Sequence, residues 1–187
     1  MHSRADYDGP TGLGTRICTA GFASGAPVTG CTAAQLLRSP SFELRRISPW
    51  KAGPYVLNKA TSDVPAHTGS RMAWLDGNGF THTALSPRRS RSRPAASTPR
   101  SRLNTHTDCP AGPAADTFTV RVLDSSGTVL RRLAGYSNKG AVAGYHKHSF
   151  SLARYAGQRV TLKFTAKQTL IGHVTSFIED DNALHVS

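Results

Sequence analysis

One segment of this chain, residues 117–122, alternates strictly between polar and apolar side chains, and this pattern restricts the fold more than any other feature. Its apolar members are Phe118, Val120 and Val122. Because successive side chains of a strand point to opposite faces, these three share one face, which predicts a half-buried strand. The residues Asp-Ser-Ser-Gly at 124–127 predict a turn, and 128–133 predict the returning arm of a hairpin.

Shorter alternating segments recur on both sides of this hairpin. They lie at 70–75, at 149–152, around Val160, Leu162 and Phe164, around Phe177 and Ile178, and around Leu184 and Val186. The chain has 17 Gly and 11 Pro and only 18% charged residues, a composition that favours strands and turns. Short strands without a long helix predict an all-β fold, an antiparallel β-sandwich of jelly-roll type.

The first 39 residues differ from the rest in composition. They are rich in Gly, Thr, Ala and Pro, and only 33–37 has the composition of a helical turn. A length of 187 residues fits one domain of ordinary size. We therefore expect an irregular tail, a linker at 23–39 and one β-sandwich at 40–187.

An arginine-rich block interrupts this organisation at 87–102. It reads PRRSRSRPAASTPRSR, lies where the spacing of strands requires another strand, and offers no apolar face. The block contributes strongly to the net charge of +12. Its residues Arg88, Arg89, Arg91 and Arg93 suit nonspecific nucleic-acid binding, because arginine pairs well with phosphate. No aromatic platform or recognition helix accompanies them.

No motif of an enzyme is present. The sequence lacks a GxSxG elbow and an HExxH motif, so we predict no catalytic residue. Cys18, Cys31 and Cys109 match no zinc or redox spacing, and a Cys18–Cys31 bridge and free thiols both stay open. The N-terminus has no apolar export signal and no apolar run has membrane-spanning length, which predicts a cytoplasmic location if the chain is made as written.

Aromatic residues offer a possible sugar-binding surface. Trp50, Trp74 and Tyr145 are candidates because an aromatic face packs on the apolar face of a pyranose, although such residues more often fill the core. Trp50 follows Pro49 and is expected to be the more exposed, whereas Trp74 alternates in step with Met72, a pattern typical of a core residue.

A polar loop, LDGNGFTHT at 75–83, supplies two further ligand candidates. These are Asp76 and His82. The alternative is that Asp76 and Asn78 cap backbone amides in turns made possible by the neighbouring glycines.

Carboxylates near the two ends of the predicted sandwich are candidates for a calcium site. They are Glu43, Asp180 and Asp181, which we expect to meet, and calcium prefers carboxylate oxygens. The alternative is solvated turn residues or salt-bridge partners. His146 and His148 share a strand face and suit a transition metal, although surface histidines without a third ligand are the other interpretation.

Several separated motifs resemble known modules. The segments SPSFELRRISPW (39–50), AHTGSRMAWLDGNGFTHT (66–83), DTFTVRVLDSSGTVL (116–130), GYHKHSFSLARYAGQRVTLKFTA (144–166) and TSFIEDDNALHVS (175–187) are similar to a jelly-roll module that follows the catalytic domains of secreted actinobacterial proteases. YDGPTGLGT at 7–15 resembles the closing turn of the sedolisin family of serine-carboxyl peptidases.

The resemblance implies a non-catalytic accessory domain. Residues 1–22 would then be a remnant of the catalytic domain's end, with the catalytic residues absent, and the domain would stabilise, tether or target an extracellular peptidase. Its partner would be an extracellular polysaccharide or the peptidase's protein substrate. In the sedolisin family an aspartate at the position of Asp8 helps to hold calcium, but Arg4 and Asp6 stand where the family has glycines.

The resemblance also bears on residues 87–102. Related modules have an alternating apolar strand there, so we expect the block to lack a strand, because it is disordered or read in a shifted frame restored near Leu103. The nucleotide sequence read in all three frames tests this hypothesis.

Overall fold

The described residues form two antiparallel β-sheets. The structure is a computed structural model that describes residues 34–35, 37, 39–44, 50–77, 83–87, 90–91, 97–107, 112–155, 158–169 and 173–186. The first sheet has the order β10 (His146–Ser149), β7 (Ser97–Thr107), β12 (Thr175–Val186), β4 (Arg71–Asp76) and β3 (Leu57–Lys59), and β1 (Ala34–Gln35) also pairs with β12. The second has the order β2 (Trp50–Lys51), β5 (Thr83–Pro87), β11 (Arg159–Lys167), β8 (Thr117–Leu123) and β9 (Val129–Ser137), and β6 (Ser90–Arg91) also pairs with β11. Two short 3-10 turns, η1 (Asn138–Gly140) and η2 (Ala153–Tyr155), lie in the connections.

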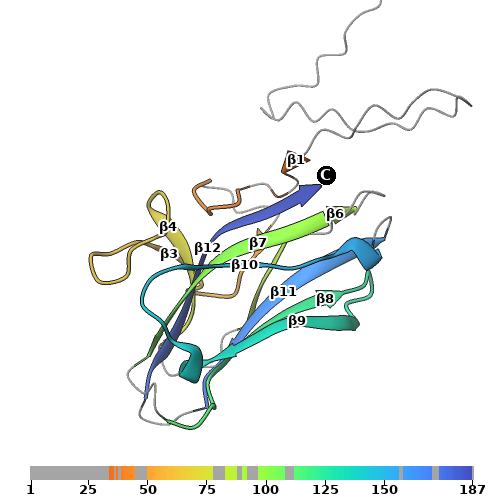
Figure 1. Cartoon of the computed structure of the whole chain (residues 1–187). Helices are drawn as coiled ribbons and strands as arrows, with labels where there is room; N and C mark the ends of the chain where they lie inside the picture. Colours follow the sequence, from red (N-terminus) through yellow and green to blue (C-terminus); the bar gives the residue numbers. More distant parts are fainter. Residues whose placement is uncertain are drawn as a thin grey trace, which may run out of the picture.

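The sheets pack face to face as a sandwich, which confirms the predicted fold class (Figure 1). Neighbouring strands are mostly far apart in sequence: β12, the last strand, lies between β7 and β4. The alternating segment predicted at 117–122 is β8, and the predicted hairpin is its antiparallel pairing with β9.

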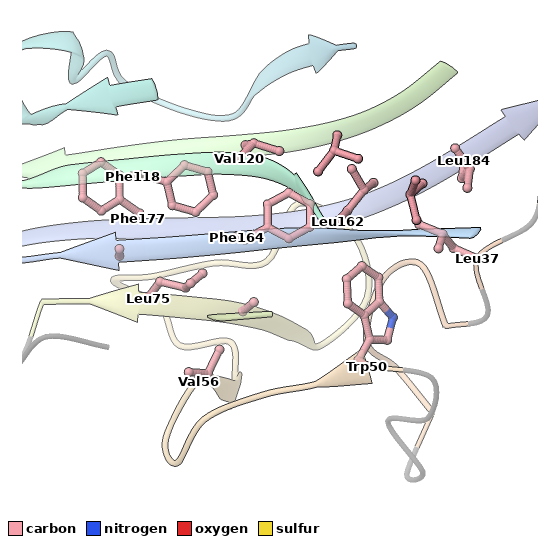
Figure 2. Packing of buried hydrophobic residues seen from close by; sticks show 14 of the residues in the cluster. Leu37, Trp50, Val56, Leu75, Phe118, Val120, Leu162, Phe164, Phe177 and Leu184 are labelled. Atoms are coloured by element: carbon pink, nitrogen blue, oxygen red, sulfur yellow. The ribbon is translucent and has the colours of Figure 1, made fainter. Parts of the chain in front are cut away.

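Aromatic rings fill the space between the sheets. Phe118 of β8 lies with its ring centroid 5.5 Å from that of Phe177 on β12 and 6.2 Å from that of Phe164 on β11. Val120, Val122 and Leu162 extend the same apolar layer, and all are buried. Figure 2 shows Val120 and Leu162 in this layer. The alternation seen in the sequence therefore points into the core, as a half-buried strand requires.

The turn between β8 and β9 is built by Asp124. Its Oδ1 accepts hydrogen bonds from the backbone N–H groups of Ser126 (2.8 Å) and Thr128 (2.9 Å). Gly127 adopts φ of +94°, a conformation that favours glycine because it has no Cβ. This confirms the turn predicted from the residues at 124–127.

The segment before Pro40 takes part in the sandwich. Ala34–Gln35 is a strand rather than the helical turn expected at 33–37, with Ala34 opposite Val186. Leu37 is buried in the core cluster. The end of β12 offers backbone hydrogen-bonding groups to β1, and such pairing outweighs the weak helical preference of so short a segment.

Part of the arginine-rich block forms strands, so the expectation of a missing strand at 87–102 is wrong for Ser90–Arg91 and for Ser97–Arg102. Arg102 lies opposite Lys147 of β10 and Asp180 of β12, which places β7 between these strands. Ladder hydrogen bonds use backbone groups, and a polar segment can form a strand when partners lie on both sides. Residues 88–89 and 92–96 are outside the described part. The shifted reading frame stays a prediction.

Candidate functional site

The pair β4–β12 presents two different faces. Ala73, Leu75 and Phe177 belong to the core cluster between the sheets. Trp74 lies directly opposite Ile178, and opposite residues of an antiparallel pair share a face. Because side chains alternate along a strand, Trp74 and Ile178 lie on the face directed away from the core, which we call the outer face.

Trp74 is the aromatic residue that β4 places on the outer face. It is half-buried, whereas Ile178 beside it is 2% exposed. A Cβ built on Gly77 would lie 2.2 Å from Ser176 Oγ and 2.8 Å from Trp74 Nε1, so the indole nitrogen and the Ser176 hydroxyl both approach the Gly77 backbone. Within the described residues, Trp74 Nε1 is buried without a hydrogen-bond partner.

Asp76 ends β4 two residues after Trp74. It is 3% exposed, has φ of +69°, and accepts a hydrogen bond from Gly77 N–H on Oδ1 (3.1 Å). Its Oδ2 has no partner in the described part of the chain. Burial raises the pKa of Asp76 to about 7, the Gly77 hydrogen bond opposes this rise, and the Asp116 carboxylate adds to it. A buried polar atom without a partner is rare and is satisfied by bound water or by a ligand.

The loop between β3 and β4, residues 60–70, is tied to a bulge in β12. The β7–β12 register shifts between Asp180 and Ala183. There Asp180 Oδ2 accepts from Thr68 N–H (3.0 Å), while Asp181 accepts from the Thr68 hydroxyl (2.6 Å) and contacts His67. Bulges commonly redirect side chains in this way.

Tyr145, which precedes β10, meets the same loop. Its hydroxyl donates to Pro65 O (2.9 Å), and its ring packs edge-on against His67 with centroids 5.3 Å apart. Burial, together with the charges of Asp180 and Asp181, raises the pKa of Tyr145. Since β3 and β10 are the opposite edges of the sheet order, the loop connects one side of the outer face with the other.

Glu43 binds the end of this loop. Its carboxylate accepts from Ser70 N–H (2.9 Å), the Ser70 hydroxyl (2.9 Å) and Arg71 N–H (2.7 Å). Burial acts to raise the pKa of Glu43, but the hydrogen bonds from Ser70 and Arg71 hold it below the ordinary value. Asn182 N–H also donates to Pro40 O (2.8 Å), so the segment at 39–43 lies against β12.

Replacing Gly69 with alanine is expected to destabilise the protein. Gly69 has φ of +68°, and an added Cβ would lie 2.6 Å from Glu43 Oε1. The left-handed conformation alone costs about 1 to 2 kcal/mol for other residues. Urea unfolding measures this loss, with Gly140→Ala as the control because nothing lies within 4 Å of its added Cβ. Equal stability of the two variants would contradict the predicted role of Gly69.

The predicted calcium ligands do not converge in the described structure. Glu43 and Asp181 contact different residues of the segment 67–71. Within the described ranges, no group of three or more His, Cys, Asp or Glu side chains is placed to hold a metal ion. Asp8 lies outside them. The described carboxylates Glu43 and Asp181 therefore do not form a calcium site together, and they are engaged by N–H and O–H donors instead.

The two histidines of β10 have separate partners. Tyr136 and His148 share a hydrogen bond of 2.8 Å between the phenol oxygen and Nδ1. Nε2 of His146 lies 3.2 Å from Ala143 O. Burial, followed by the charge of His146, lowers the pKa of His148. These contacts agree better with structural histidines than with a metal pair.

The exposure expected of Trp50 is wrong. Trp50 is 3% exposed, its Nε1 donates to Ser39 O (3.0 Å), and its ring centroid lies 5.1 Å from that of Phe42 and 6.4 Å from that of Phe164. It points toward Phe164 in the core (Figure 2). The preceding turn at 39–42 supplies both the carbonyl and the aromatic neighbour, so a tryptophan after Pro49 becomes a core residue.

The other predicted residues are divided between the outer face and undescribed segments. Asp76 lies beside Trp74, and Tyr145 lies at the far side of the β3–β4 loop. His82, Arg88, Arg89 and Arg93 are outside the described residues, as are all three cysteines. Arg91 is in β6, opposite Arg159.

For Trp74 the sequence favours a core position over a sugar-stacking one, because Trp74 alternates with Met72. A useful signal was present: the residues Met-Ala-Trp-Leu at 72–75 are apolar on both faces of the strand. A strand in a two-layer sandwich normally needs only one apolar face, so the second requires a cover or a ligand.

The described residues include no helix long and apolar enough to cross a membrane.

Comparison with known proteins identifies the fold. No protein-family model matches the chain, and no curated protein matches it by sequence. Among solved structures, the chain is similar to the carbohydrate-binding module TmCBM61 in complex with β-1,4-galactotriose, with TM-score 0.56, 18% identity, and coverage of 82% of this chain and 99% of that one.

Two further structures share the architecture. They are the CBM22-1-CBM22-2 tandem domain of Paenibacillus barcinonensis Xyn10C (TM-score 0.52, 16% identity, 84% and 47% coverage) and the K1 adhesin domain of Lys-gingipain from Porphyromonas gingivalis W83 (TM-score 0.51, 13% identity, 83% and 99% coverage). The chain therefore has the β-sandwich fold of these domains.

Proposed function

We propose that this chain is a non-catalytic carbohydrate-binding domain that holds a neutral polysaccharide against the outer face at Trp74. The observation that carries the proposal is the half-buried indole of Trp74 on the sheet face away from the core. An indole ring with one accessible side can stack on the apolar C–H face of a sugar ring.

Polar atoms beside Trp74 suit sugar hydroxyls. Asp76 Oδ2 and Trp74 Nε1 are buried and have no partner among the described residues, and the Ser176 hydroxyl lies close by. Ligand sites typically combine an apolar surface with a few polar groups of this kind. Asp76 and Asp180 place carboxyl groups on this strand pair, which favours a neutral chain over an acidic one.

The comparisons support this proposal through the fold. TmCBM61 shares the sandwich and was solved with β-1,4-galactotriose. The gingipain adhesin domain has the same architecture, so the fold alone does not select the ligand. The half-buried indole of Trp74 is the observation that supports a sugar as the ligand.

Attachment to a secreted sedolisin-like peptidase remains part of the proposal. It rests on the resemblance at 7–15, a segment outside the described residues. A sugar-binding domain would tether such a peptidase to an extracellular polysaccharide, and the chain itself would hydrolyse nothing.

Depletion by insoluble polysaccharides tests the function. We expect β-1,4-galactan or xylan to remove the purified chain from solution, and high salt to leave this binding unchanged because stacking does not depend on charge. Binding to a DNA duplex serves as the comparison. Retention by DNA alone, lost at high salt, would favour the arginine block as a nucleic-acid site and contradict the proposal.

A further inference from the structure

Tyr55 is the most exposed large apolar side chain of the described residues. It is 82% exposed and lies in the turn before β3. Its φ of +61° is in the left-handed region, which is unfavourable for a bulky side chain. Such a conformation persists only where the surroundings impose it, and it is common at binding sites.

The surroundings of Tyr55 impose this conformation. Asn58 Nδ2 donates to Tyr55 O (2.7 Å) and to Val56 O (3.3 Å). Val56, the next residue, is 1% exposed and anchors the turn in the core. The backbone is therefore fixed while the ring of Tyr55 is left in solvent, and this arrangement gives the fold no evident gain in buried apolar area.

The turn also places Tyr55 next to a residue that is hydrogen-bonded to Trp74. Val56 O accepts the hydrogen bond from Trp74 N–H (2.7 Å). Neighbouring strands lie about 4.8 Å apart, and Tyr55 precedes Val56 by one residue, about 3.8 Å along the chain. Tyr55 therefore lies close to Trp74 along the chain and across the sheet, beside β3, the edge strand of the sheet.

We propose that Tyr55 is a second stacking residue, which extends the surface around Trp74 across the β3 edge so that the domain binds an internal stretch of a polysaccharide chain. This inference rests on the proposed function. At 82% exposure the Tyr55 ring is open to solvent, so a chain stacked on it can continue past the edge strand. Affinity should consequently rise with the length of the oligosaccharide until both rings are occupied.

Calorimetric titration with β-1,4-linked galacto-oligosaccharides of increasing length, and with xylo-oligosaccharides as the second probe, tests the inference. Tyr55→Ala is expected to bind the shortest oligosaccharide as the wild type does and the longest about tenfold more weakly. Tyr55→Phe should keep the full affinity. Tyr55→Gly should bind like Tyr55→Ala but melt at a higher temperature, because glycine removes the backbone strain.

Three outcomes separate this inference from the proposed function. A loss confined to long oligosaccharides supports Tyr55 as a stacking residue. Unchanged affinity of Tyr55→Ala at every length, with binding still lost in Trp74→Ala, overturns the role of Tyr55 and leaves the proposed function standing. If the wild type binds none of these oligosaccharides, both ideas fail together.

Discussion

Replacing Trp74 with alanine is expected to weaken polysaccharide binding by about 10- to 100-fold, the effect of removing a central tryptophan anchor. The ring lies on the outer face opposite Ile178 and is half-buried, so its removal takes away the stacking surface. Trp74 is not part of the core cluster, and the variant should therefore keep its fold. Depletion by β-1,4-galactan measures the loss, and circular dichroism checks the fold.

Two variants sharpen this prediction. Trp74→Phe keeps a flat ring but removes the buried indole N–H, and it should retain most of the affinity if stacking dominates. Val129→Ala removes an exposed apolar side chain on β9, in the other sheet, and should bind as the wild type does. Full affinity in a folded Trp74→Ala variant would place the sugar elsewhere or exclude it.

Replacing Asp76 with asparagine is expected to stabilise the protein clearly more at pH 8 than at pH 5. The pKa of Asp76 is about 7 in the folded protein and near 3.8 in an unfolded chain. The folded state therefore holds its proton up to a higher pH, and stability falls as the pH rises from about 4 through 7. At pH 8 the buried carboxylate costs on the order of 2 to 4 kcal/mol, which the neutral amide avoids.

Urea unfolding of both proteins across this pH range measures the effect. Asp180, whose pKa burial raises to about 6, adds a change of the same sign to wild type and variant alike. Asp63→Asn, at an exposed carboxyl of the β3–β4 loop, is the matched control. The difference in unfolding free energy between the wild type and Asp76→Asn should change between pH 5 and pH 8. If it is the same at both pH values, the folded protein does not hold a proton on Asp76.

The sheet structure could be predicted wherever local pattern and turn chemistry agree. β8 has strict alternation, and the Asp124 turn supplies its own hydrogen-bond acceptor, so the hairpin follows from a short segment. β7 could not be predicted because its sequence is polar and contains proline. Its place depends on backbone partners in β10 and β12, which are far away in sequence.

The candidate site was predicted only in part, for a related reason. The sequence placed Asp76 near a ligand but took Trp50 as exposed and Trp74 as buried. A strand that is apolar on both faces does not reveal which face meets the other sheet. That choice depends on long-range contacts, such as the packing of Phe177, which lies opposite Leu75, against Phe118 of the other sheet.

Titration calorimetry of the wild type with a β-1,4-linked galacto-oligosaccharide, repeated at high salt and at two temperatures, tests sugar binding at Trp74. We expect one saturable site per chain, an affinity independent of salt, and a negative heat-capacity change from burial of apolar surface on Trp74. If a folded chain gives no binding heat with this ligand or with a xylo-oligosaccharide, sugar binding at Trp74 is contradicted.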